Sequence, residues 1–258
     1  MIRIACRVGS EIQFLSTTKF HSGEFIIPKF DWKSCNEIEV QCFYDSDADI
    51  AALLLLGAHL REIEDLDGDI NLFIPYIPYS RMDRFTDKEY EQFTALKSLL
   101  FNYYYNKIYT RDLHNPSTNK GLEAINREYK GIISNHHAVV LPDKTAFLRY
   151  TNTYGFDKRF IVFDKVRDGG KIVSKIVFDN TNFMDADFII VDDICSRGGT
   201  FSNAAIEIRD KYPNRELNFD LLISHTENGI FTGNLFDHIR TVYTTNSILT
   251  DTTNPLMA

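Results

Sequence analysis

Short apolar runs alternate with longer amphipathic stretches along most of this chain, and this alternation limits its possible folds more than any other feature. The apolar runs predict strands at Ile2–Val8, Glu37–Phe43, Ile70–Tyr76, Lys107–Asp112, His137–Pro142, Phe160–Lys165, Phe188–Asp193, Phe219–Ser224 and Thr241–Thr245. The stretches between them predict helices at Asp47–Glu62, Glu89–Tyr105, Thr145–Gly155 and Thr200–Lys211. Strands joined through helices form mainly parallel sheets, so we predict an α/β protein.

The series of strands and helices runs twice, once before about Ser134 and once after it. A polar stretch from His114 to His137 lies between the two series. We therefore predict two α/β domains, at residues 1–134 and 135–258, each a mainly parallel sheet flanked by helices. A packing of the last residues on the N-terminal domain is left open.

Charge and cysteine spacing exclude several classes of protein. Lys and Arg total 28 against 36 Asp and Glu, a formal charge of -8, which argues against nucleic acid as the main partner. The longest apolar run, Ile50–Leu60, is too short to span a bilayer, and the first residues lack the pattern of a signal peptide. The cysteines Cys6, Cys35, Cys42 and Cys195 form neither a CxxC pair nor a metal-site spacing, so we expect free thiols in a reducing cytoplasm.

The stretch FIIVDDICSRGGTF, from Phe188 to Phe201, carries the chemistry. Its adjacent aspartates, Asp192 and Asp193, follow an apolar strand, where ligands of parallel sheets bind. The Gly-Gly pair and the following helix can bind a phosphate, with help from Arg197, while the carboxylates accept bonds from sugar hydroxyls or hold magnesium. This predicts a phosphorylated sugar as ligand. An acidic strand end with an ordinary Gly-Gly turn is the alternative, and for Cys195 a small filler residue is favoured over a nucleophile.

This stretch resembles the phosphoribosyl-diphosphate (PRPP) binding motif of type I phosphoribosyltransferases and PRPP synthetases. In that motif two acidic residues precede a loop that reads Asp-Thr-Gly-Gly-Thr, so Ser196 and Arg197 depart from the usual pattern. The resemblance implies that ribose 5-phosphate binds to Asp192, Asp193, Ser196, Arg197, Gly198, Gly199 and Thr200.

Further motifs, in the same order along the chain, are similar to those of PRPP synthetases. FIPYIPYSRMDR is similar to the segment that carries the ATP-facing arginines Arg81 and Arg84, with Met82 in place of a glutamine. TRDLHNP implies that His114 binds magnesium near the ATP phosphates, and VVLPDKTAFLRY implies that Asp143 is the second metal contact.

Two other segments complete the resemblance. VFDKVRDGGKIV implies that Lys165 and Arg167 lie on a loop over the transferring group and stabilise its charge. KFHSGEF implies that Phe20 and Glu24 reach the adenine of ATP bound to a neighbouring subunit, although Ser22 replaces the usual aspartate. Taken singly, these segments also fit ordinary turns, solvated hairpins and satisfied polar residues.

The resemblance implies a cytoplasmic PRPP synthetase, or ribose-phosphate diphosphokinase, with two phosphoribosyltransferase-like domains. It would transfer the diphosphoryl group of Mg-ATP to the C1 hydroxyl of ribose 5-phosphate, giving PRPP and AMP. The implied cofactor is Mg²⁺ and the implied assembly is a homo-oligomer, a dimer or larger. The charge and the short apolar runs lead us to expect no nucleic-acid and no membrane partner. Three alternatives stay open: a type I phosphoribosyltransferase that consumes PRPP, a catalytically silent regulatory subunit, and a sugar-phosphate binding protein without ATP chemistry.

Overall fold

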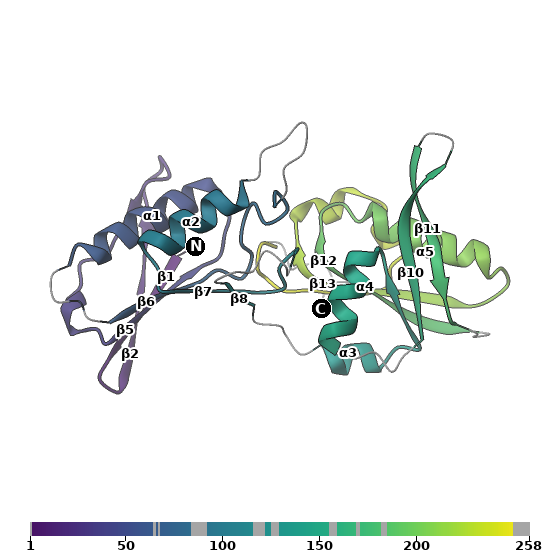
Figure 1. The fold of residues 1–258 in the computed structure, drawn as a ribbon, viewed down its shortest axis with the longest axis horizontal. Helices are drawn as coiled ribbons and strands as arrows, with labels where there is room; N and C mark the ends of the chain where they lie inside the picture. The colour runs from purple at the N-terminus through teal and green to yellow at the C-terminus, as the bar shows by residue number, and fades with distance from the viewer. Residues whose placement is uncertain are drawn as a thin grey trace. The chain divides into compact units, whose positions relative to one another are not determined.

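A computed structural model of the protein describes residues 2–63, 66, 68–83, 92–115, 122–124, 129–154, 159–168, 171–181 and 185–249. The chain divides into two compact units, Met1–Asn126 (unit 1) and Arg127–Ala258 (unit 2), and each has its own sheet (Figure 1). Both sheets are mainly parallel and carry helices, so the predicted α/β fold is confirmed.

Unit 1 contains a sheet in the order β2-β1-β5-β6-β7-β8. Its strands are β1 (Ile2–Val8), β2 (Glu11–Ser16), β5 (Glu37–Cys42), β6 (Asp69–Phe73), β7 (Lys107–Thr110) and β8 (Leu122–Ala124). Strands β5 to β8 run parallel, whereas β1 is antiparallel to both of its neighbours. A small hairpin of β3 (Thr18–Lys19) and β4 (Phe25–Ile26) and a short 3₁₀ helix, η1 (Trp32–Ser34), lie between β2 and β5.

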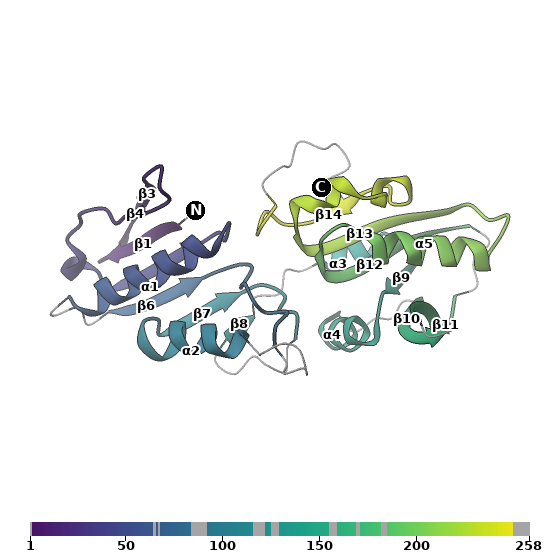
Figure 2. The same cartoon turned by 90° about the horizontal axis from the view of Figure 1, so that it is seen from above.

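Helices α1 (Asp47–Arg61) and α2 (Phe93–Tyr103) cover one face of this sheet (Figures 1 and 2). The strands β5, β6 and β7 follow one another in the sheet, so right-handed crossovers put both helices on the same side. In β5 every second side chain is buried against them: Ile38, Val40 and Cys42. On β2, at the edge of the sheet, Ile12 and Phe14 stay 48% and 67% exposed.

Unit 2 contains a sheet in the order β11-β10-β9-β12-β13-β14. Its strands are β9 (Ala138–Leu141), β10 (Arg159–Asp168), β11 (Lys171–Asp179), β12 (Ala186–Cys195), β13 (Leu217–Thr226) and β14 (Val242–Tyr243). Its helices are α3 (Lys130–Ser134), α4 (Lys144–Tyr154) and α5 (Gly199–Lys211), followed by the 3₁₀ helices η3 (Asn228–Thr232) and η4 (Leu235–Asp237). Strands β10 and β11 form an antiparallel hairpin, and β9, β10, β12, β13 and β14 are parallel.

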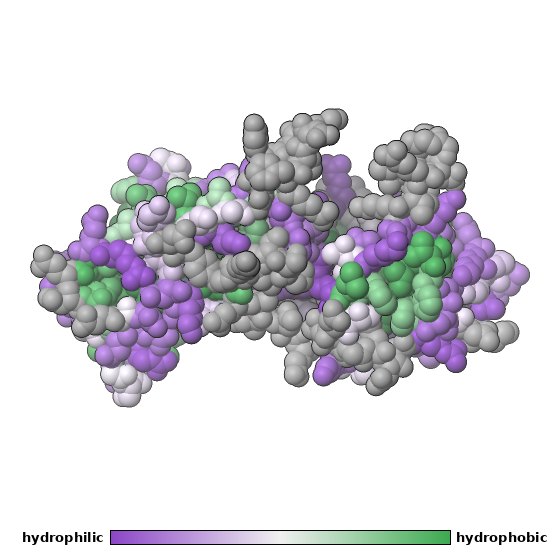
Figure 3. Space-filling model, in the orientation of Figure 1, coloured by the Kyte–Doolittle hydropathy of each residue, from purple (hydrophilic) through white to green (hydrophobic). Residues whose placement is uncertain are grey.

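The central strands of unit 2 are buried on both faces, which explains why their sequences are almost continuously apolar. In β12, Phe188 and Ile190 belong to a core with α5, while Ile189 and Val191 belong to a core with α3 and α4. Some apolar surface remains exposed, and Figure 3 shows an apolar patch over α4 and the β10–β11 hairpin. The exposed apolar side chains of these elements include Leu148, on α4. In the described part of the chain, no helix has the length and apolar character needed to cross a membrane.

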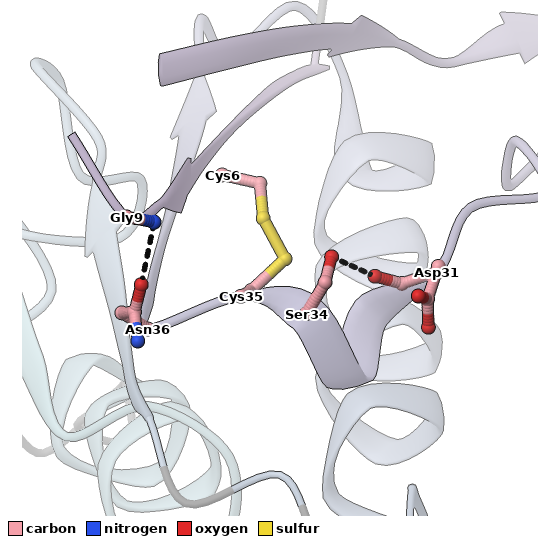
Figure 4. Close-up of a disulfide and its surroundings, with 6 residues drawn as sticks. All are labelled: Cys6, Gly9, Asp31, Ser34, Cys35 and Asn36. Atoms are coloured by element: carbon pink, nitrogen blue, oxygen red, sulfur yellow. Dashed lines mark hydrogen bonds between the residues drawn. A yellow bond between two sulfur atoms is a disulfide. The ribbon is translucent and has the colours of Figure 1, made fainter. Parts of the chain in front are cut away.

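A disulfide joins Cys6 on β1 to Cys35, just after η1, with the two Cα atoms 5.7 Å apart (Figure 4). The expectation of free thiols at these two positions is therefore wrong. Cys42 and Cys195 are free, and both are buried.

The reason for this pairing lies in the sheet and not in the spacing of the cysteines. Strand β5 runs antiparallel beside β1, with Arg7 opposite Glu37, so the chain just before β5 returns to the end of β1. Asn36 fixes this return, because its N–H donates to the carbonyl of Arg7 (2.8 Å) and its side-chain Oδ1 accepts from the N–H of Gly9 (2.8 Å; Figure 4). The two cysteines, 29 residues apart in sequence, thereby become neighbours.

Candidate functional site

The loop between β12 and α5 turns sharply at Gly198, which is the N-cap of α5 and has a φ of 78°. Side chains other than glycine rarely adopt this left-handed conformation. A Cβ at this position would also lie 2.8 Å from Cβ of Leu235, on η4. Position 198 therefore requires glycine for two reasons, its left-handed backbone conformation and the lack of space for a Cβ.

The segment after β13 holds this loop in place from the other side. Ser196 donates from its Oγ to Oε2 of Glu227 (2.6 Å), and the N–H of Glu227 donates to the carbonyl of Cys195 (2.9 Å). Gly233 lies so close that a Cβ there would overlap the carbonyl oxygen of Arg197. The loop is thus a fixed platform and not a free surface turn.

The outer side of the loop can bind an anion. Arg197, Gly199 and Thr200 are exposed, whereas Gly198 is buried beneath them. Helix α5 has 13 residues, and its positive dipole end lies at this loop. The N–H groups of Phe201 and Ser202 donate to the carbonyl of Gly198 (3.0 Å each), so the N–H groups that could meet an anion are those of Gly199 and Thr200. This is the arrangement expected of a phosphate-binding turn.

The two aspartates differ in their surroundings. Strand β12 does not end at them, as the sequence suggested, but continues to Cys195. Asp193 is buried, and its Oδ1 forms an ion pair with Nη1 of Arg149, on α4, at 2.8 Å. Oδ1 of Asp192 lies 3.6 Å from the same nitrogen, and the Asp192 side chain is 18% exposed. The backbone N–H of Asp193 donates to Oδ1 of Asp192 (2.9 Å).

Burial shifts the acidity of two groups on β12. Burial and the neighbouring charge of Asp193 raise the pKa of Asp192 well above its usual range, while Arg149 acts in the opposite direction. Burial, with added repulsion from Glu227 and Asp192, raises the pKa of the Cys195 thiol to about 12. A thiol with this pKa is protonated at neutral pH and is a poor nucleophile, and Cys195 is a buried residue of β12 and not a loop filler.

Asp143 lies at the same end of the sheet as Asp192. It follows β9, the parallel neighbour of β12, and its Oδ1 accepts from the N–H of Ala146 (2.8 Å) at the start of α4. Its negative charge contributes to the raised pKa of Asp192, so the two carboxyl groups lie close enough to interact. Among the described residues, no group of three or more metal-type side chains comes together.

The segment with Lys165 and Arg167 forms the β10–β11 hairpin, in which these residues lie opposite Ser174 and Ile172. The side chains of Lys165 and Arg167 lie outside the described atoms. At the base of the hairpin, Asp164 forms an ion pair with Lys144 (2.6 Å), the first residue of α4. The hairpin is thus connected to the helix that follows Asp143.

In unit 1, the two segments predicted to face ATP lie side by side. The chain after β6 and the chain after β7 are joined where the N–H of Ile74 donates to the carbonyl of Tyr109 (2.9 Å). Farther along, Nδ2 of Asn115, next to His114, donates to Oδ2 of Asp83 (2.6 Å), two residues after Arg81. Arg84 lies outside the described residues.

Phe20 and Glu24 lie on the turn of the β3–β4 hairpin. The N–H of Phe20 donates to the carbonyl of Glu24 (2.9 Å), and the Phe20 side chain is 59% exposed. The hairpin is attached to the start of α1 because Lys19 forms an ion pair with the fully buried Asp49 (3.1 Å). Ser22, which replaces the usual aspartate, donates to Oε2 of Glu24 (2.6 Å).

Arg149 and Glu227 are parts of this site that were not predicted from the sequence. Arg149 lies in the second turn of the helix that Asp143 starts, next to the strand that carries the aspartates. This place, in the second turn of a helix that begins after a predicted metal ligand, is the feature of the sequence that could have identified Arg149. Glu227 follows the parallel strand β13 in the same way as Asp143 follows β9.

Named proteins resemble this chain over most of its length. No protein-family model matches the chain. The ribose-phosphate pyrophosphokinase of Thermococcus kodakarensis is 31% identical over 216 residues, which cover 78% of this chain and 74% of the relative. That of Pyrococcus abyssi is 30% identical over 207 residues, covering 74% and 70%.

The fold also agrees with a solved structure. A phosphoribosylpyrophosphate synthetase from Mycobacterium smegmatis superposes with a TM-score of 0.69 at 18% identity, covering 94% of this chain and 84% of that one. With motifs, fold and relatives in agreement over most of its length, the chain belongs to the ribose-phosphate pyrophosphokinase family.

Proposed function

We propose that the protein transfers the diphosphoryl group of ATP to the C1 hydroxyl of ribose 5-phosphate, giving PRPP and AMP. The observation that carries this proposal is the turn at Gly198, which leads into the N-terminus of α5 beside Asp192 and Asp193, in a chain of this family. A phosphate on the turn and hydroxyls beside carboxylates are the two recognition features that ribose 5-phosphate needs.

On unit 2, we expect the loop Ser196–Thr200 to bind the 5-phosphate. The exposed residues Gly199 and Thr200 at the start of α5, together with the exposed Arg197, support this assignment. Ser196 is already bonded to Glu227, so we expect it to contribute its backbone more than its hydroxyl. Asp192 and Asp193 remain the candidates for the ribose hydroxyls.

On unit 1, we expect Arg81, Arg84 and His114 to contact ATP. The bond between Asn115 and Asp83 supports this, because it holds the segments of Arg81 and His114 together. The exposed Phe20, with Glu24, is offered to the adenine of ATP on a second copy, so we propose that the protein works as a homo-oligomer. We also propose that it works in the cytoplasm, and its likeness to ribose-phosphate pyrophosphokinases supports this.

The donor atoms near Asp143 fit magnesium. Mg²⁺ takes oxygen ligands and is usually held by one or two carboxylates together with substrate phosphates and water. Asp143 and Asp192 supply two neighbouring carboxyl groups, and the absence of a larger cluster among the described residues is compatible with a metal that arrives with ATP. We expect Asp143 to contact it on unit 2, while His114 remains the predicted contact on unit 1. When bound, the ion would neutralise charge on the phosphates.

Lys165 and Arg167 are the proposed catalytic residues. Transfer of a phosphoryl-type group needs little covalent help from a protein, so positioning and charge stabilisation supply most of the rate. Two cations on a hairpin can approach the transferring group only when substrates are bound, and they then stabilise the charge that develops. Loss of one such group typically costs a factor of 10²–10³ in kcat.

The test is AMP formation from ATP by the purified protein in the presence of Mg²⁺, with and without ribose 5-phosphate. AMP that forms only with the sugar phosphate supports the proposal, and Lys165→Ala should lower its rate at least about 100-fold. Lys130→Ala, which replaces an exposed lysine on α3, is the matched control and should change nothing. If the folded protein makes no AMP but transfers the phosphoribosyl group of PRPP to a nucleobase and releases diphosphate, it is a phosphoribosyltransferase. If it does neither, a silent subunit or a binding protein is the better assignment.

A further inference from the structure

We propose that unit 1 binds a second copy of this chain through the open face of its sheet, the face that α1 and α2 do not cover. In the described part of unit 1, both α-helices lie on the other side of the sheet (Figure 1). The open face consists of the side chains that alternate with the buried ones, and it includes Ile12 and Phe14 of β2, Arg3 and Arg7 of β1, and Glu37 and Glu39 of β5. None of these residues is assigned to a substrate, so this inference goes beyond the proposed function and does not rest on it.

Apolar side chains are exposed on the open face. Ile12 and Phe14 are 48% and 67% exposed, and Phe73, on the same face of β6, is only half-buried. Side chains of the same sheet that point the other way, such as Ile38 and Val40, are fully buried. Exposed apolar side chains that lie among charged ones are typical of a surface that another protein covers.

The charged residues of the open face form two parallel rows of opposite sign. Strand β1 contributes Arg3 and Arg7. Its neighbour β5 contributes Glu37 and Glu39. A two-fold axis that runs parallel to these strands, above the line between them, places the basic row of each copy over the acidic row of the other. Arg7 then meets Glu37 of the second copy, because the two residues are register partners. A surface that complements itself in this way selects a second copy over an unrelated protein.

Within one copy, the ion pair of Arg7 and Glu37 leaves both side chains accessible. Nε of Arg7 lies 3.3 Å from Oε2 of Glu37, and the two side chains are 47% and 45% exposed. An exposed pair of this kind contributes little to the stability of unit 1. The planar fork of an arginine can hold a second carboxylate. Binding of a second copy therefore joins two exposed pairs into one network of four charges and breaks neither pair.

A hollow on the open face has room for a side chain from the second copy. It holds about 100 Å³ and lies at Ala5, whose small side chain is surrounded by those of Arg7, Ile12, Glu37 and Glu39. A nucleotide is too large for this hollow, but the end of a side chain fits. The two-fold axis places Glu39 of the second copy over Ala5, because these residues are register partners. The hollow can therefore take that carboxylate next to Arg7.

A buried amide on the open face lacks one hydrogen-bond partner. Asn71, on β6, is 5% exposed, and its Nδ2 donates to Oε1 of Glu37 (3.3 Å). Its Oδ1 has no partner among the described atoms. A buried acceptor without a donor is unfavourable, so such atoms are rare in a completed fold. A donor from a second copy would complete this amide.

The test measures the dissociation constant of self-association for the full chain, by light scattering over a range of concentrations and without substrates. Arg7→Glu puts like charges opposite each other at two symmetric contacts, so it should raise this constant at least about 100-fold. Glu37→Arg should raise it as much. An equimolar mixture of the two variants should associate within about tenfold of the wild type, because each contact between them again joins opposite charges.

Two further variants separate this contact from other causes. The double variant Arg7→Glu/Glu37→Arg exchanges both charges, so it should associate with itself like the wild type but not with the wild type. Lys97→Glu is the matched control, because it makes the same change of charge on α2, on the other side of the sheet, and should leave self-association unchanged. Circular dichroism verifies that each variant is folded, which we expect because the exposed pair of Arg7 and Glu37 contributes little to stability.

Three results would overturn the proposal. The wild type could remain monomeric at every concentration. Both single variants could associate as tightly as the wild type, which would put the contact on another surface. The mixture of the two variants could associate no better than its components, which would mean that the two rows of charge do not face each other. Each of these results overturns this inference alone, because AMP formation tests the proposed function separately.

Discussion

Reduction of the Cys6–Cys35 disulfide should lower the free energy of unfolding of unit 1 by about 3.6 kcal/mol. The bond joins residues 29 apart in sequence. In the chain-entropy model, a closed loop of this length removes about 12 cal/mol/K from the unfolded chain, which is about 3.6 kcal/mol at 25 °C. For a unit of this size, that loss corresponds to a fall in the melting temperature of roughly 10–20 °C.

The chain offers its own reporter for this measurement. Trp32 is its single tryptophan; it is buried beside Phe30 and lies three residues before Cys35. Its fluorescence therefore follows the unfolding of unit 1 alone, whereas circular dichroism follows both units. Unfolding is recorded with and without reductant, and free thiols are counted in the unfolded protein.

The expected thiol count without reductant is two, from Cys42 and Cys195, and it rises to four with reductant. Cys42→Ala is the control: it removes a buried but unlinked sulfur from the same core and should cost only about 1 kcal/mol of packing. Four reactive thiols without reductant, or a midpoint of Trp32 unfolding that reductant does not change, would contradict this prediction.

Two other changes test the fold at single residues. Gly198→Ala should lower the free energy of unfolding in urea by about 1–3 kcal/mol, because alanine is strained at a left-handed φ and its Cβ would clash with the Leu235 side chain. Gly199→Ala is the control: nothing lies within 4 Å of the new Cβ, so the free energy of unfolding should change by less than about 0.5 kcal/mol. Burial raises the pKa of Asp220, but hydrogen bonds from His136 and Arg240 outweigh it and bring the pKa from 3.8 to about 2. Because the pKa of Asp220 is lower in the folded state than in the unfolded state, its ionised form stabilises the protein above pH 4, and this contribution is lost as the pH falls toward 2. The free energy of unfolding should therefore fall by about 2 kcal/mol between pH 4 and pH 2. Asp220→Asn should remove this dependence on pH.

Local sequence patterns predicted the elements whose side chains are buried on a regular period. The helix predicted at Thr200–Lys211 is α5 (Gly199–Lys211), and the strand predicted at Ile2–Val8 is β1. Strand β2 escaped prediction, because its residues are nearly all exposed and no buried face imposes a period on EIQFLS. A pattern of burial cannot be read from a strand that buries so little.

The parts of the candidate site that were missed depend on tertiary contacts. Arg149 is an ordinary helix residue in sequence, and only the packing of α4 on β12 brings it to Asp193. The pairing of Cys6 with Cys35 likewise requires β5 to return beside β1. The aspartates and the glycine turn, by contrast, are contiguous in sequence, so the motif itself carried the information.

The exposed edge of unit 1 bears on how this protein behaves at high concentration. In the described part of the chain, β2 has a strand on one side only, and its side chains Ile12 and Phe14 are exposed to solvent. Such an edge can add a strand from any other molecule that carries a similar one, so the purified protein should self-associate as it is concentrated. A single charge, as in Phe14→Lys, would act as a gatekeeper on that edge and make the protein easier to crystallise. Because β1 and β5 separate β2 from β6 and β7, the strands that Arg81 and His114 follow, this gain in solubility should leave the contacts of these two residues with ATP unchanged.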